Sequence, residues 1–194
     1  MAINLPSSKP QANVATYLEE FRKLYLQQAL SNAIQASDLR VLNEELDQIA
    51  PAQDLKHLAS RGIRGEFVFA LPSLLSTKPY LLGYYRLLLG YSQKEFYMKA
   101  KLGRFKRLEE EGRLTERIKD EIPALCAALV KRASDLLREI WFGKVTLELL
   151  DDLSLLTLGP QLRGSNNTRI GEVANRAVFE IIQQIVKHAI VGAT

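Results

Sequence analysis

Residues 159–172, GPQLRGSNNTRIGE, place phosphate- and base-binding side chains between two apolar stretches. Arginine presents parallel N–H donors that match a phosphate or guanine O6 and N7, and asparagine matches adenine or backbone oxygens. At a helix N-terminus, free N–H groups and the helix dipole add attraction for phosphate. This chemistry predicts contact with DNA or RNA by five residues: Arg163, Ser165, Asn166, Asn167 and Arg169. We expect the arginines to read guanine edges or clamp phosphates, and Ser165 and Asn167 to position the backbone.

The same stretch also fits a capped loop that binds nothing. In that interpretation Gly159-Pro160 ends one helix, Gly164 permits a tight bend, and Asn167 or Thr168 caps the next helix. The residues alone leave both interpretations open.

A second cationic stretch covers residues 94–107, which we call the basic segment. It carries six basic residues against one acid, Glu95, so its net charge of +5 exceeds the +4 of the whole chain. Such a segment suits a polyanion, although many charge runs are only solvated faces. Sequence-independent attraction to phosphates is predicted for Lys94, Lys99, Lys101, Arg104, Lys106 and Arg107.

Catalytic and metal-binding motifs are absent from the sequence. It holds no GxGxxG, GxxxxGK[ST] or GxSxG pattern, and neither His57 nor His188 has a Cys or His at metal-ligand spacing. Metal-dependent nucleases use an acid-x-Lys element at the end of a strand, and the one match, Asp54-Leu55-Lys56, lies in a predicted short helix. We therefore assign no catalytic or metal-binding residue.

The composition favours a cytoplasmic protein of one domain. The single cysteine, Cys126, lies in an apolar run and is expected to be a buried hydrophobe in a reducing compartment. No stretch approaches the ~20 apolar residues that span a bilayer, and the N-terminus lacks the pattern of a signal peptide. We expect no membrane contact.

Apolar residues at helical spacing predict a mainly α, compact multi-helix unit over residues 13–194, after a flexible stretch at 1–12. Ser37 is expected to cap a helix that ends before Pro51, and Ser92 and Glu95 form a capping-box pattern. Residues 67–69 are expected to be briefly extended. Further helices are predicted at 13–34, 52–60, from Pro79 to Gly90, from Pro123 to Trp141, and from about 170 onward.

Three blocks resemble the XcyI-type family of type II restriction endonucleases, whose members cut at CCCGGG. They are RGEFVF (64–69), GYYRLLLGYSQKEFY (83–97) and LTLGPQLRGSNNTRIGE (156–172), in the family's order and approximate spacing. The resemblance covers residues 61–190 well. It implies a prokaryotic host with a restriction-modification system and a protecting methyltransferase. It also implies a homodimer on palindromic double-stranded DNA and Mg²⁺-dependent cleavage.

The resemblance places the family's metal-binding strand and acid-x-Lys element after the terminal helix, so its α/β nuclease sheet is expected to lie outside this chain. We therefore expect this chain to be the helical DNA-recognition part, inactive by itself and without bound Mg²⁺. The family's RGS-x-N element falls on Arg163, Gly164, Ser165 and Asn167.

The family's YYR element falls on Tyr84, Tyr85 and Arg86, and Arg86 joins the predicted DNA contacts. The two tyrosines are expected in the core, because leucines surround them at helical spacing. Glu66 is expected in an ordinary surface ion pair, the alternative being a carboxylate that supports the active site of the complete enzyme.

Two further hypotheses remain open from the sequence. One is a helical regulatory or interaction protein, an inactive relative whose basic segment meets an acidic protein. The other is a regulator that binds DNA without cutting it.

Overall fold

The structure is a computed structural model that describes residues 26–140 and 145–164, with side chains described as far as residue 159. The predicted flexible N-terminus, the start of the first helix and the terminal helix lie outside these residues. Within them the chain is helical and contains no strand. None of the described helices is long and apolar enough to cross a membrane.

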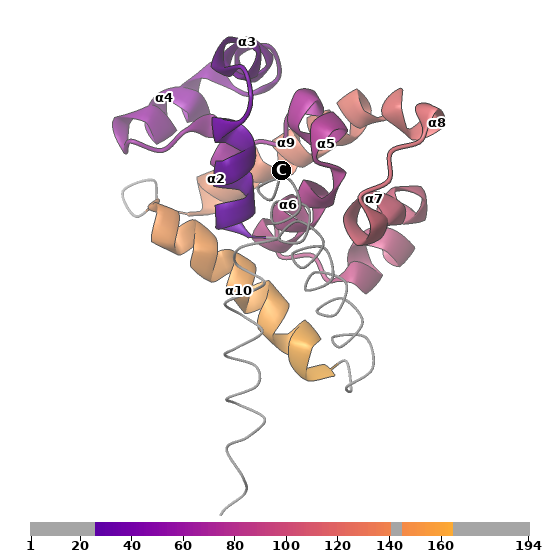
Figure 1. The fold of residues 1–194 in the computed structure, drawn as a ribbon. Coiled ribbons are helices and arrows are strands. Elements are labelled where there is room, and N and C mark those ends of the chain that lie inside the picture. Colours follow the sequence, from indigo (N-terminus) through magenta and orange to yellow (C-terminus); the bar gives the residue numbers. More distant parts are fainter. Residues whose placement is uncertain (1–25, 141–144, 165–194) are drawn as a thin grey trace, which may run out of the picture.

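Two groups of helices flank a central one (Figure 1). Helices α3 and α4 lie at one end, α7 and α8 lie at the other, and α6 runs between them. The first half of the described chain contains α2 (Gln27–Gln35), α3 (Leu39–Ile49), α4 (Ala52–Ser60), the 3-10 helix η1 (Gly65–Phe67), α5 (Pro72–Thr77), the 3-10 helix η2 (Pro79–Leu81) and α6 (Leu82–Leu88). The second half contains the π-helix η3 (Lys94–Lys99), the 3-10 helix η4 (Gly103–Phe105), α7 (Lys106–Glu111), α8 (Glu116–Lys119), α9 (Ile122–Glu139) and α10 (Leu147–Gly164).

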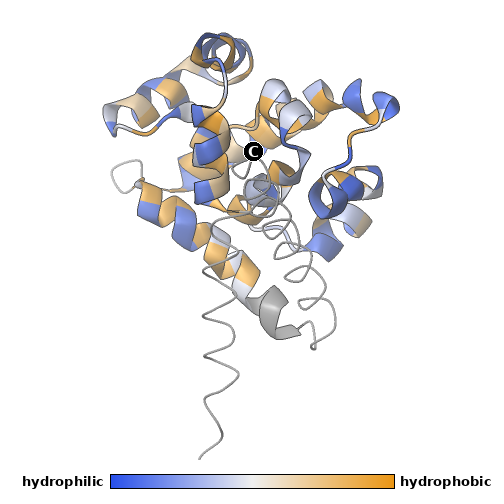
Figure 2. Ribbon diagram, viewed as in Figure 1, coloured by the Kyte–Doolittle hydropathy of each residue, from blue (hydrophilic) through white to orange (hydrophobic). Residues whose placement is uncertain are grey.

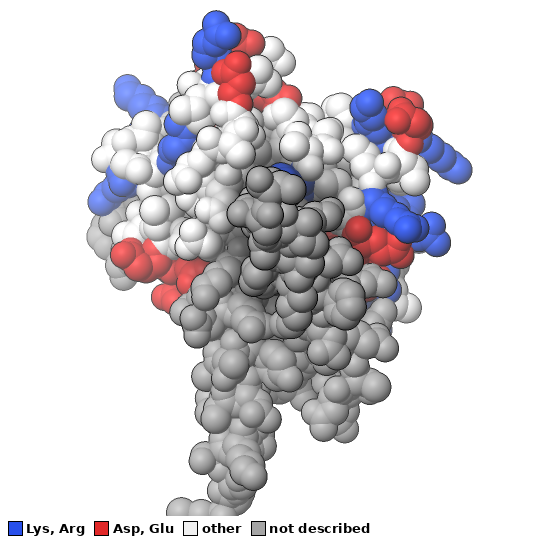
Figure 3. Space-filling view, in the orientation of Figure 1, with Lys and Arg blue, Asp and Glu red and all other residues white. Residues whose placement is uncertain are grey.

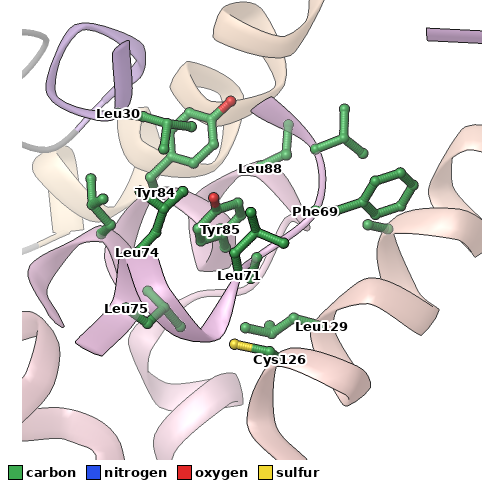
Figure 4. Packing of buried hydrophobic residues seen from close by; sticks show 14 of the residues in the cluster. Leu30, Phe69, Leu71, Leu74, Leu75, Tyr84, Tyr85, Leu88, Cys126 and Leu129 are labelled. Atoms are coloured by element: carbon green, nitrogen blue, oxygen red, sulfur yellow. The ribbon is translucent and has the colours of Figure 1, made fainter. Parts of the chain in front are cut away.

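The core forms around α6, whose seven residues are all buried. Tyr84 and Tyr85 pack edge to face, with ring centroids 5.2 Å apart, and leucines of α5 and α9 close around them (Figure 4). Apolar residues line the inner sides of the surrounding helices, while polar residues occupy the outer turns of α3, α4, α7 and α8 (Figure 2). This arrangement confirms that the two tyrosines belong to the core.

Helix α10 packs along α6 and continues past its predicted end. Leu158 of α10 is buried with Leu26 and Leu87, and Ser154 is fully buried on the same helix. Proline removes one helical hydrogen bond, yet the helix runs through Gly159-Pro160 and is described as far as Gly164. The prediction that it ends at residue 159 was wrong, because packing of this apolar face against α6 outweighs the local signal.

Three other local predictions differ from the structure. Asp38, not Ser37, caps α3 by accepting a 2.9 Å hydrogen bond from the Arg40 N–H, while the Ser37 hydroxyl donates to the Ala33 carbonyl at 2.8 Å. Residues 67–69 were expected to be extended, but Phe67 ends the 3-10 helix Gly65–Phe67 and Val68 has αR geometry. Helix α5 was not predicted.

Candidate nucleic-acid interface

The basic segment starts on a well-defined turn. The Ser92 N–H donates to a Glu95 carboxylate oxygen at 3.0 Å, and the Glu95 N–H donates to the Ser92 hydroxyl at 3.2 Å. This reciprocal pair confirms the predicted capping box. Hydrogen bonds from Ser92 hold the pKa of the exposed Glu95 carboxyl below its usual value. The π-helix η3 follows, a rare element that is often found at functional sites.

Acidic neighbours neutralise half of the predicted cations in this segment. Arg104 pairs with Glu121, and Lys106 pairs with Glu110 at 3.2 Å. Arg107 lies 4.0 Å from Glu111. Figure 3 shows acidic and basic side chains side by side over α7 and α8.

The other three cations are solvent-exposed: Lys94, Lys99 and Lys101. None of them forms an ion pair within 4.0 Å with a carboxylate of the described residues. Lys101 has φ of 58°, in the left-handed region that few residues other than glycine adopt. These lysines are therefore the cations of the segment best placed to meet phosphates.

Arg86 is placed in the interior, which corrects its assignment as a DNA contact. Its side chain is 3% exposed and donates to both carboxylate oxygens of Glu109, at 2.8 and 2.7 Å. A third donor reaches the Tyr91 carbonyl at 2.6 Å. A guanidinium that is buried and hydrogen-bonded in this way is not accessible to DNA.

Glu66 also forms an ion pair, but a buried one and not the expected surface pair. Its side chain is fully buried, and Arg64 donates to both of its carboxylate oxygens. The Tyr85 hydroxyl donates to the Glu66 carbonyl at 2.9 Å, and the Tyr84 hydroxyl donates to the Phe67 carbonyl at 2.7 Å. Two hydrogen bonds thus join the RGEFVF block to the tyrosines of the GYYR sequence in the core.

The described residues do not fit a magnesium site. They contain no group of three His, Cys, Asp or Glu side chains that could hold a metal ion. Asp54 and Lys56 lie on α4 as predicted, the first buried and the second exposed. Burial raises the pKa of the Cys126 thiol to about 12, which agrees with a structural cysteine.

The predicted arginine-asparagine contact lies at the edge of the described structure. Arg163 is in the last described turn of α10 and its side chain is not described. Ser165, Asn166, Asn167 and Arg169 lie outside the described residues. Their roles remain predictions from chemistry.

Glu109 is the polar residue at this site that sequence reasoning missed. It is the first of three consecutive glutamates, and it pairs with Arg86. A usable signal was present, because Phe105 and Leu108 define the buried side of this turn and Glu109 follows Phe105 by one helical repeat.

Comparison with known proteins gives one family. The model of the family described as XcyI restriction endonuclease matches residues 15–194. The type II restriction enzyme XcyI of Xanthomonas campestris pv. cyanopsidis is 46% identical over 190 residues, which cover 96% of this chain and 57% of that enzyme. The type II restriction enzyme Cfr9I of Citrobacter freundii is 46% identical over 191 residues, covering 97% and 58%. No solved structure matches. The chain thus spans less than three-fifths of the length of either relative.

Proposed function

Because this chain belongs to the XcyI restriction endonuclease family, we propose that it supplies DNA recognition in a type II restriction endonuclease. The observation that carries the proposal is the 46% identity to two type II restriction enzymes across nearly the whole chain. Fold likeness alone would not license a function, whereas 46% identity to two named type II restriction enzymes supports a shared activity.

The charge distribution supports duplex DNA as the substrate. Three exposed lysines of the basic segment are available for phosphates, and the arginines at 163 and 169 supply donors for guanine edges. Lysines attract every sequence alike through counterion release, while paired donors on a base edge discriminate. We propose that the basic segment binds phosphates of any sequence and that the stretch containing Arg163 and Arg169 discriminates between sequences.

We further propose CCCGGG as the target, a homodimer as the binding form, and Mg²⁺ as the cofactor of cleavage. Each of these rests on the resemblance of the sequence blocks to the family. A homodimer matches a palindromic target because its twofold symmetry presents the same side chains to both half-sites. The proposed cellular setting is the cytoplasm of a prokaryote, beside a methyltransferase that protects host DNA.

The proposal is tested by binding to a CCCGGG duplex and to a scrambled duplex of equal length. We expect the CCCGGG duplex to bind more tightly, and Arg163→Ala to cost about 1–3 kcal/mol on that duplex alone. Lys101→Ala is the matched control, because it should weaken both duplexes alike. Equal affinity for the two duplexes contradicts CCCGGG recognition, and no binding at low salt contradicts DNA recognition altogether, favouring an acidic protein partner.

Cleavage is a separate measurement. We expect these 194 residues to leave a CCCGGG plasmid intact with Mg²⁺, since the one acid-x-Lys match lies on a helix with its acid buried. Cutting at CCCGGG by this chain contradicts that expectation while supporting the wider assignment.

A further inference from the structure

Glu109 contacts residues of α6, of the turn before the basic segment, and of the segment itself. Its side chain is 11% exposed and accepts from Arg86 on α6 at 2.7 and 2.8 Å. The Tyr97 hydroxyl of η3 donates to it at 2.5 Å, and the Gln93 amide donates at 3.4 Å. One carboxylate thus contacts both the turn before the basic segment and the core helix behind it.

These contacts fix the basic segment at both ends. Gln93 immediately precedes it and Tyr97 lies in its first turn, while Glu109 comes two residues after its last cation. The Tyr97 ring packs edge to face on Phe96, and Phe105 is 2% exposed near the other end. The three exposed lysines of the segment, at positions 94, 99 and 101, lie between these contacts in the sequence.

Glu109 is charged in this position. Burial alone raises the pKa of its carboxyl, but the hydrogen bonds and charge of Arg86 outweigh burial and bring the pKa below the usual value. The absence of a side chain at Gly83 makes room for it, since a Cβ there would lie 3.1 Å from the Glu109 Cγ. The GYYR and SQKEFY blocks therefore both contribute to one buried ionic cluster.

We propose that Glu109 is a positioning residue for DNA contact: it holds Tyr97 and Arg86 so that the basic segment presents Lys94, Lys99 and Lys101 in one fixed arrangement. The inference rests on the proposed function, because it assumes that these lysines meet DNA. A fixed arrangement favours binding, since flexible side chains and loops lose entropy when they are ordered by a ligand. The lysines touch phosphates, and Glu109 acts only through the segment that carries them.

Two matched variants separate positioning from ordinary stability. Tyr97→Phe deletes the hydroxyl that donates to Glu109 and keeps the ring on Phe96. Tyr84→Phe deletes another part-buried hydrogen bond of a tyrosine hydroxyl, the one to the Phe67 carbonyl, which lies outside the basic segment. Both are expected to fold, because each removes one oxygen and leaves a filled core.

The first measurement is hydrogen exchange of the amides of residues 94–107. Tyr97→Phe should speed their exchange about 10-fold, the effect of one lost hydrogen bond to a charged group, while Tyr84→Phe leaves them unchanged. Equal exchange in the two variants overturns the inference, whether or not the wild-type chain binds DNA.

The second measurement is duplex affinity as a function of salt. Tyr97→Phe should bind about 10-fold more weakly than Tyr84→Phe with the salt dependence of the wild type, because no lysine has been removed. Equal affinities of the two variants overturn the inference. A wild-type chain that binds no duplex contradicts the proposed function itself. The exchange data then still show whether Glu109 holds the basic segment in place.

Discussion

The Tyr85 hydroxyl donates a 2.9 Å hydrogen bond to the carbonyl oxygen of Glu66, 19 positions earlier in the chain. The bond is buried and ties η1 to the central helix α6. Tyr85 and Glu66, which belong to sequence blocks that resemble the family, therefore have a structural role in the core. The base contacts that we propose lie elsewhere, at Arg163 and Arg169.

Removal of Arg64 should destabilise the fold more than removal of an exposed arginine. Arg64→Ala leaves the buried Glu66 carboxylate without its partner, and we expect a loss of about 2–3 kcal/mol, below the cost for a fully buried pair because Arg64 is 40% exposed. The control Arg132→Ala breaks an exposed pair with Asp135 and should cost under about 1 kcal/mol. Urea unfolding measures both, and equal losses contradict the burial argument.

Adding one methyl group should have unequal effects at two glycines. A Cβ at Gly65 would lie 2.8 Å from a Leu55 methyl and 2.9 Å from a Leu46 methyl, so Gly65→Ala should cost about 1–3 kcal/mol through overpacking. At Gly159, on α10, a Cβ would meet nothing described within 4 Å apart from its own helix backbone and its chain neighbours. Gly159→Ala should therefore cost less than Gly65→Ala, because the higher helix propensity of alanine offsets the clash of its Cβ with the ring of Pro160. Thermal unfolding checks the pair, and a stabilising Gly65→Ala contradicts the close packing at η1.

Acid should remove the contribution of Glu109 to stability. Its pKa is lowered in the folded state, so its contribution is complete above the unfolded pKa of about 4.3 and is lost as the pH falls through the lower folded pKa. Glu109→Gln should be less stable than wild type at pH 7, with the difference narrowing below about pH 4. The control Glu116→Gln alters a 93% exposed carboxylate and should change stability little. A difference for Glu109→Gln that stays constant from pH 7 to pH 3 contradicts the ionic cluster.

Helices with strong periodicity and clear boundary residues were predictable. Helix α3 ends before Pro51, α4 occupies the expected 52–60, and α9 begins one residue before Pro123. The end of α10 was mispredicted because Gly159-Pro160 is a local signal, whereas the helix is stabilised by contacts with α6, about 70 positions away in the sequence.

The sequence predicted where the cations of the candidate interface lie, but not all of their ion-pair partners. Counting residues located the basic segment, and two of its neutralising pairs follow i,i+4 spacing, so they could have been anticipated. The partner of Arg86 lies 23 positions away, and only the packing of α7 on the core brings the two together. A buried arginine and a surface arginine look alike until that packing is known.

The dependence of duplex affinity on salt tests the central claim most directly. For a CCCGGG duplex we expect log K to fall steeply with log salt, and the combined Lys94→Ala, Lys99→Ala and Lys101→Ala variant to reduce the slope by about 0.9 for each lysine removed. The combined Lys106→Ala and Arg107→Ala variant, which removes cations that have acidic neighbours, should change the slope less. A wild-type affinity independent of salt, or a triple variant with the wild-type slope, contradicts DNA binding by the basic segment.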